Sequence, residues 1–129
     1  MSDTLLIIED NEQNFYLMRF LLEKSGYTVI GAESGREGVE KALRHAPRAI
    51  LLDIQLPEMD GYAVAAELKK HGEMEGVPII AVTSYAMVGD RERILAAGAT
   101  GYIEKPINPE TFVAEITRHL TKDPGDKER

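Results

Sequence analysis

The sequence contains no cysteine, which excludes both a disulfide framework and a thiolate site. No apolar run approaches the length of a membrane span, and residues 1–8 lack the basic start and long apolar centre of a signal peptide. Acidic residues outnumber basic ones by 22 to 15, for a formal net charge of −7, and no basic face suited to nucleic acid is visible. These absences favour a cytoplasmic protein that contacts neither membranes nor nucleic acids.

The composition is that of an ordinary globular domain. Hydrophobic residues make up 43% and charged residues 29% of the 129 positions, a balance that argues against disorder. The length suits one domain with a real core. We expect this domain to cover residues 1–122, and we expect residues 123–129, which are charged and begin with Asp-Pro-Gly, to form a frayed tail.

Short runs rich in Ile, Leu and Val alternate along the chain with segments of helical periodicity. Strands buried on both faces have this composition. Strand–helix alternation predicts an α/β fold, in which right-handed crossovers build a parallel sheet with helices on both faces. The pattern predicts strands at 4–9, 27–32, 49–53, 77–83 and 100–103, and helices at 12–25, 35–46, 62–71, 87–97 and 109–121.

Two of the predicted helices carry start signals. Ser34 followed by Glu37 is typical of a capping box. In this motif the serine side chain accepts a hydrogen bond from the backbone N–H of the glutamate, and the glutamate side chain accepts one from the backbone N–H of the serine. Asn108 can cap the last helix, and Pro109 suits its first turn.

Polar side chains stand where four of the predicted strands end. In a parallel sheet, all these ends lie on one edge, which is where such sheets bind their ligands. We therefore expect three carboxylates, a hydroxyl and an ammonium to meet there, from Glu9, Asp10, Asp53, Thr83 and Lys105.

Three acids at one edge suggest a particular chemistry. Two like charges about 4 Å apart cost on the order of 4 kcal/mol at an effective dielectric constant of 20, so either a cation compensates them or one acid holds a proton. Oxygen ligands with open positions favour Mg²⁺, which usually takes only one or two protein carboxylates. A remaining carboxylate can then attack phosphorus and form an acyl phosphate.

With these residues, the chain resembles the receiver domain of bacterial two-component response regulators. Each motif alone is weak, but their combination and order are specific. The resemblance spans residues 8 to 106, and the helical pattern extends it to about 121. The matching motifs are Ile8-Glu9-Asp10-Asn11, Leu52-Asp53-Ile54-Gln55-Leu56-Pro57, Met59-Asp60-Gly61, Val82-Thr83-Ser84, Gly98-Ala99 and Tyr102-Ile103-Glu104-Lys105-Pro106.

The resemblance implies a flavodoxin-like, doubly wound sheet of five parallel strands in the order 2-1-3-4-5, with five helices. It implies that Asp53 accepts the phosphoryl group. It implies that Mg²⁺, for which Mn²⁺ can substitute, is bound by Asp10 and Asp53, with Glu9 in the shell around the ion and the backbone carbonyl of Gln55 as a further ligand.

The other implied roles concern the conformational response. Thr83 and Lys105 would contact the phosphoryl group, the Lys105–Pro106 bond would be cis, and Thr83 and Tyr102 would form the switch. The family's phosphodonor is a sensor histidine kinase or a histidine phosphotransfer protein. We expect a stand-alone receiver that binds a downstream protein through residues 86–120, and that is no enzyme beyond taking part in its own phosphorylation and autodephosphorylation.

Two alternatives share parts of this pattern. An aspartyl-phosphate phosphatase uses acids and a lysine in a similar way, but it usually carries a lid domain and a second acid where this chain has Gln55. A flavin or nucleotide carrier on the same fold needs a phosphate-binding loop after the first strand. Here that place holds Glu9 and Asp10, which repel phosphate unless a metal is bound.

Overall fold

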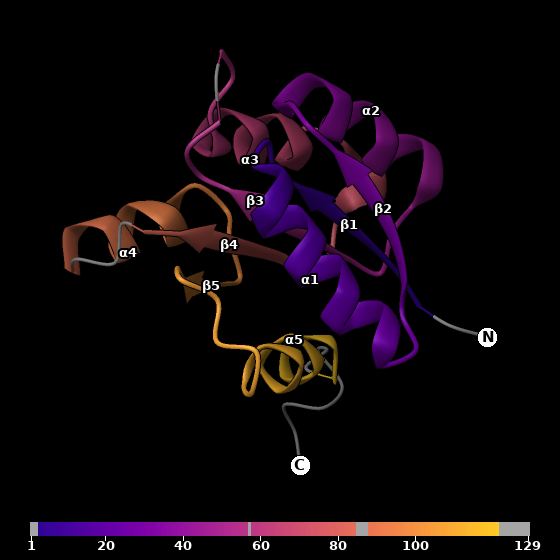
Figure 1. The fold of residues 1–129 in the computed structure, drawn as a ribbon. Coiled ribbons are helices and arrows are strands. Elements are labelled where there is room, and N and C mark those ends of the chain that lie inside the picture. Colours follow the sequence, from indigo (N-terminus) through magenta and orange to yellow (C-terminus); the bar gives the residue numbers. More distant parts are fainter. Residues whose placement is uncertain (1–2, 57, 85–87, 122–129) are drawn as a thin grey trace.

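The computed structural model describes residues 3–56, 58–84 and 88–121. Its centre is a parallel sheet with the strand order β2-β1-β3-β4-β5 (Figure 1), which confirms the predicted α/β architecture and strand order. The strands are β1 (Thr4–Ile8), β2 (Thr28–Ala32), β3 (Ala49–Asp53), β4 (Ile79–Thr83) and β5 (Gly101–Glu104). Each lies within two residues of its predicted bounds.

In the described ranges, four α-helices connect consecutive strands and a fifth follows β5, and the five divide between the two faces of the sheet. Helices α1 and α5 pack on one face, and α2, α3 and α4 pack on the other (Figure 1). The helices are α1 (Glu12–Lys24), α2 (Gly35–His45), α3 (Gly61–Lys69), α4 (Val88–Ala96) and α5 (Phe112–Thr121).

The sheet is buried on both faces, as its composition predicts. Leu5 and Ile7 of β1 face the core under α1 and α5, whereas Leu6 and Ile8 face the core under α2 and α3. All four are fully buried, because successive side chains of a strand point to opposite faces and both faces are covered.

The last helix begins later than predicted. Residues 109–111 form a turn, and α5 starts at Phe112 rather than at Pro109. Asn108 organises this turn, because its Oδ1 accepts from the Glu110 N–H at 2.9 Å and its carbonyl accepts from the Phe112 N–H at 3.0 Å. The capping residue was therefore identified correctly, but it caps a turn that precedes the helix.

The capping box of α2 also differs in one partner. Ser34 Oγ accepts from the Glu37 N–H as predicted, but Glu37 Oε1 accepts from the N–H of Glu33 rather than from that of Ser34.

A short 3-10 helix, η1 (Gly72–Met74), was not predicted. Of the described helices, none combines the length and apolar character that a membrane span needs. The predicted tail at 123–129 and the domain end at 122 lie outside the described residues.

Candidate functional site

The candidate site lies at the carboxyl edge of the sheet, and the strand register places its residues side by side. Ile8 pairs with Leu52, so Glu9 follows β1 next to the position where Asp53 ends β3. Thr83, the last residue of β4, pairs with Glu104, so Lys105 follows immediately beyond this pair. Residues far apart in sequence therefore meet because parallel strands end at one edge.

The three predicted carboxylates form one group. Glu9, Asp10 and Asp53 each offer an oxygen atom, and these atoms all lie within 4.8 Å of one another. Glu9 and Asp53 are only 2% and 3% exposed, whereas Asp10 is exposed. Two buried acids beside a third at the solvent boundary make a negatively charged pocket with one open side.

Lys105 supplies the positive charge inside this pocket. Its Nζ lies 3.2 Å from Glu9 Oε1 and 3.4 Å from Asp53 Oδ1. The lysine side chain is 13% exposed, so the ion pairs are largely shielded from water. The Lys105–Pro106 peptide bond is cis, the isomer that the family resemblance implies.

One ammonium does not balance three carboxylates, and Glu9 shows the imbalance. Its burial, followed by the neighbouring Asp53 carboxyl group, raises the pKa of Glu9 to about 7, although the Asn11 N–H and Lys105 act in the opposite direction. No group among the described residues donates a hydrogen bond of good geometry to Glu9 Oε1, although the Lys105 ammonium lies close to it. A second cation with a preference for oxygen ligands fits this pocket, and Mg²⁺ has that preference.

The remaining predicted residues differ in how they lie relative to the carboxylates. The backbone N–H of Gln55 donates to Asp53 Oδ1 at 3.0 Å, which holds the Asp53 side chain against the residues that follow it. Thr83 is fully buried. Tyr102 packs against an apolar cluster of Ile54, Ala81 and Ile94 rather than among the carboxylates. We call Ile54, Ala81 and Ile94 the Ile94 cluster.

Asp60 and Gly61, which belong to one of the motifs that carry the family resemblance, attach the start of α3 to the end of β3. Asp60 Oδ1 caps α3 by accepting from the Ala63 N–H at 3.0 Å, and the Gly61 N–H donates to the Ile54 carbonyl at 3.0 Å. A Cβ on Gly61 would lie 2.5 Å from Ile54 Cα and 2.8 Å from the Asp53 carbonyl oxygen. The close approach of α3 to the end of β3 therefore requires glycine.

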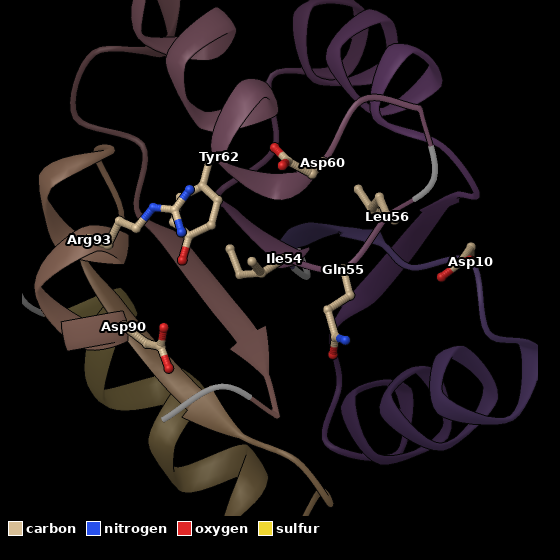
Figure 2. Close-up of a pocket in the computed structure, with 8 residues that line it drawn as sticks. All are labelled: Asp10, Ile54, Gln55, Leu56, Asp60, Tyr62, Asp90 and Arg93. Carbon is tan, nitrogen blue, oxygen red and sulfur yellow. The ribbon is translucent and has the colours of Figure 1, made fainter. Parts of the chain in front are cut away.

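A cleft of about 830 Å³ opens beside the carboxylates, between the start of α3 and α4 (Figure 2). Asp10 and Gln55 line it on the side of Asp53. The opposite wall includes Tyr62 and Arg93, whose guanidinium carbon lies 4.3 Å from the centre of the tyrosine ring. We refer to it as the α3–α4 cleft. Sequence reasoning missed this wall, because no motif marks exposed helix positions.

Comparison with known proteins identifies the family. The sequence profile of the response regulator receiver domain matches residues 5–117. The polar-differentiation response regulator DivK of Brucella ovis is 46% identical over 120 residues, which cover 93% of this chain and 98% of that protein. The chain therefore belongs to the response regulator receiver family, whose role is phosphorylation-dependent signalling in two-component systems.

Solved structures agree with this assignment. The receiver domain of the sensor histidine kinase PA1611 from Pseudomonas aeruginosa is 34% identical, with a TM-score of 0.87 over 95% of this chain and 100% of that one, and it holds a magnesium ion in its active-site cleft. The chemotaxis protein CheY4 of Vibrio cholerae is 27% identical, with a TM-score of 0.88 over 92% of this chain and 99% of that one. The family and fold predictions are thus confirmed, and the phosphatase alternative is not favoured.

Proposed function

We propose that this chain accepts a phosphoryl group on Asp53 from a phosphohistidine, carried by a sensor histidine kinase or a histidine phosphotransfer protein. The observation that carries the proposal is the placement of Asp53. Its carboxylate is buried, Lys105 Nζ lies 3.4 Å from its Oδ1, and Glu9 and Asp10 stand within 4.8 Å as further oxygen ligands. A nucleophile, a charge-neutralising cation and a metal-binding group therefore share one pocket.

Mg²⁺ would be held by the Asp10 and Asp53 carboxylates and the Gln55 backbone carbonyl, with Glu9 in the shell around the ion. Bound there, it would neutralise charge on the transferring phosphoryl oxygens. Mn²⁺ accepts the same oxygen ligands and would substitute for it. The raised pKa of Glu9 supports a divalent cation at this place, as does the lack, among the described residues, of a well-aligned hydrogen-bond donor to its Oε1.

In the transfer, an oxygen of Asp53 forms a bond to phosphorus while the bond from phosphorus to the donor nitrogen breaks. The electron pair of the broken bond returns to the imidazole. Lys105 pairs with a phosphoryl oxygen, and Thr83 donates its hydroxyl to another. The acyl phosphate later reacts with water, so the chain takes part in its own dephosphorylation and acts on no other substrate.

The phosphoryl group would change the face formed by residues 86–120. Phosphorylation adds roughly −1.5 to −2 charge, and Thr83 would move toward it. Tyr102 packs in the Ile94 cluster, which joins β5 to α4, so a movement behind Thr83 can reach both elements. This face would bind a downstream protein in the cytoplasm rather than nucleic acid, consistent with the net charge of −7. Residues 86 and 87 of this face lie outside the described ranges.

The test is phosphorylation by a small donor. With Mg²⁺ and acetyl phosphate, intact-protein mass spectrometry should show one added phosphoryl group that is stable to acid and labile to base. Asp53→Asn should abolish it, and excess chelator should prevent it. Asp3→Asn, which changes an exposed acid before β1, is the matched control. An adduct that persists in Asp53→Asn, or that forms without a divalent metal, would contradict the proposal.

A further inference from the structure

The α3–α4 cleft is an open space beside Asp53. Asp53 is 3% exposed, so a phosphodonor must come close to it through a neighbouring opening. The cleft shares Asp10 and Gln55 with the candidate site, and Ile54, the residue after the acceptor, also lines it. Figure 2 shows Gln55 projecting into the middle of this space, with Asp10 on one side and Arg93 on the other.

The charges along the cleft oppose the arrival of an anion. Asp10, Asp60 and Asp90 line it, and Arg93 is the one cation among the lining residues in the part of the chain that the structure describes. Lys105 lies deeper and is already paired with two carboxylates. A dianionic phosphoryl group therefore meets several negative charges before it reaches the lysine.

Arg93 is fixed in place without losing its charge. Its guanidinium stacks on the ring of Tyr62 with 4.3 Å between the guanidinium carbon and the ring centre, which joins α4 to α3 along one wall of the cleft. Within the described ranges Arg93 makes no ion pair, although Asp90 lines the same cleft one turn earlier on α4. The stack limits the motion of a long side chain, and it leaves the positive charge available to an anion.

We propose that Arg93, positioned by Tyr62, guides a dianionic phosphoryl group through the α3–α4 cleft toward Asp53. The carrier can be a phosphohistidine or a free acyl phosphate, because the dianion is common to both. The inference rests on the proposed function, since it names a residue that serves the same phosphoryl transfer. Arg93 acts through its charge, and Tyr62 acts as a positioning residue for Arg93.

The experiment measures the rate constant for phosphorylation of Asp53 with Mg²⁺ at low ionic strength. Acetyl phosphate is the dianionic probe, and phosphoramidate, which carries less negative charge, is the comparison. Arg93→Gln should slow the reaction with acetyl phosphate about two- to fivefold, the size expected for one cation and a dianion across a solvated cavity. Phosphoramidate should be slowed less, and added salt should shrink both effects.

Matched variants separate charge from structure. Arg44→Gln removes the same charge at an exposed residue in the last turn of α2, which does not line the cleft, so it should leave the rate unchanged. Arg93→Lys should retain most of the rate. Tyr62→Phe keeps the ring and should match the unaltered protein, whereas Tyr62→Leu should resemble Arg93→Gln in part.

A further set of measurements distinguishes a phosphohistidine carrier from a free acyl phosphate. A phosphorylated histidine phosphotransfer protein replaces the small donor, and an equal slowing by Arg93→Gln shows that both carriers pass the arginine. Slowing with acetyl phosphate alone restricts the role to free donors. Equal slowing with both small donors, no response to salt, or the same loss in Arg44→Gln would overturn the inference. Failure of the unaltered protein to become phosphorylated would instead refute the proposed function.

Discussion

The backbone N–H of Lys105 donates a hydrogen bond to the carbonyl oxygen of Thr83 at a distance of 2.8 Å. The bond ties the end of β4 to the loop after β5, so the two residues proposed to contact the phosphoryl group are fixed to each other. Thr83 is fully buried and Lys105 is largely shielded, which leaves little freedom for one to move alone. A phosphoryl group on Asp53 that draws in one of them therefore acts on both.

Thr83→Ala should uncouple phosphoryl binding from the conformational response. Hydrogen bonds to charged groups contribute about 1.5–3 kcal/mol, so the affinity for beryllofluoride, a phosphoryl mimic, should fall roughly 10- to 100-fold in the presence of Mg²⁺. The rate of phosphorylation by acetyl phosphate should change much less. Fluorine-19 NMR or isothermal titration calorimetry measures the affinity for beryllofluoride.

The control for this change is Thr83→Ser, which keeps the hydroxyl and removes only the methyl group. It should bind beryllofluoride nearly as the unaltered protein does. If the alanine variant binds the mimic with unchanged affinity and shows the same change of structure, the hydroxyl of Thr83 plays no part in the switch.

Lys105→Met should strengthen Mg²⁺ binding while it impairs the response to phosphorylation. The ammonium lies 3.2 Å from Glu9 and 3.4 Å from Asp53, so it offsets part of the negative charge that attracts the ion. Its removal should tighten Mg²⁺ binding about three- to tenfold. Titration calorimetry measures this effect.

Lys70→Met is the matched control for the lysine. Lys70 pairs with Glu67 on the surface of α3, and its side chain is 72% exposed, so Mg²⁺ affinity should stay the same. Weaker Mg²⁺ binding in Lys105→Met would show that the lysine organises the carboxylates rather than competing with the ion.

The parts of the site that the sequence predicts well are those set by strand ends. A short apolar run ends at each of Glu9, Asp53 and Thr83. In a parallel sheet, the carboxyl ends of all strands lie at one edge. Which of these ends are neighbours depends on the strand order, which the family resemblance implies and the structure confirms by pairing β1 with β3. What the pattern does not contain is the pKa of Glu9, because that depends on how completely the folded chain excludes water.

Contacts between helix surfaces are harder to predict from one sequence. Arg93 and Tyr62 lie on different helices, and either residue alone is typical of an exposed helix face. Their contact depends on the position of α4 over the Ile94 cluster. No local sequence pattern predicts that position. The delayed start of α5 has a similar cause, since the Asn108 side chain stabilises a turn where propensity favours helix.

Gly61→Ala should destabilise the fold and disturb the backbone at Asp53 and Ile54. The added methyl group would overlap the backbone at Ile54 and Asp53, which cannot rotate away as a side chain could. We expect a loss of about 2 kcal/mol in the free energy of unfolding, measured with urea. Gly89→Ala on α4 is the control, because a Cβ at that position would have nothing within 4 Å and alanine favours helix. A loss no greater in Gly61→Ala than in Gly89→Ala would show that the loop can yield.

The last prediction concerns pH in the metal-free protein. The folded state raises the pKa of Glu9 from 4.5 to about 7, chiefly through burial. Between these two values the folded protein keeps a proton that the unfolded chain has released, so stability falls as pH rises through this window. The loss attributable to Glu9 should reach about 2 kcal/mol by neutral pH, less than the full shift implies because solvent reaches part of the site.

Urea unfolding in excess chelator, from pH 4.5 to 7.5, measures this loss in the unaltered protein and in Glu9→Gln. The glutamine cannot ionise, so the variant should gain about 2 kcal/mol relative to the unaltered protein across the window, while the other acids titrate alike in both. Excess Mg²⁺ should restore most of the loss at pH 7.5, because it binds the ionised carboxylates of the folded state only. Parallel pH profiles for the two proteins would show that Glu9 ionises in the folded state at its ordinary pKa, which would remove the electrostatic reason for a metal at this edge.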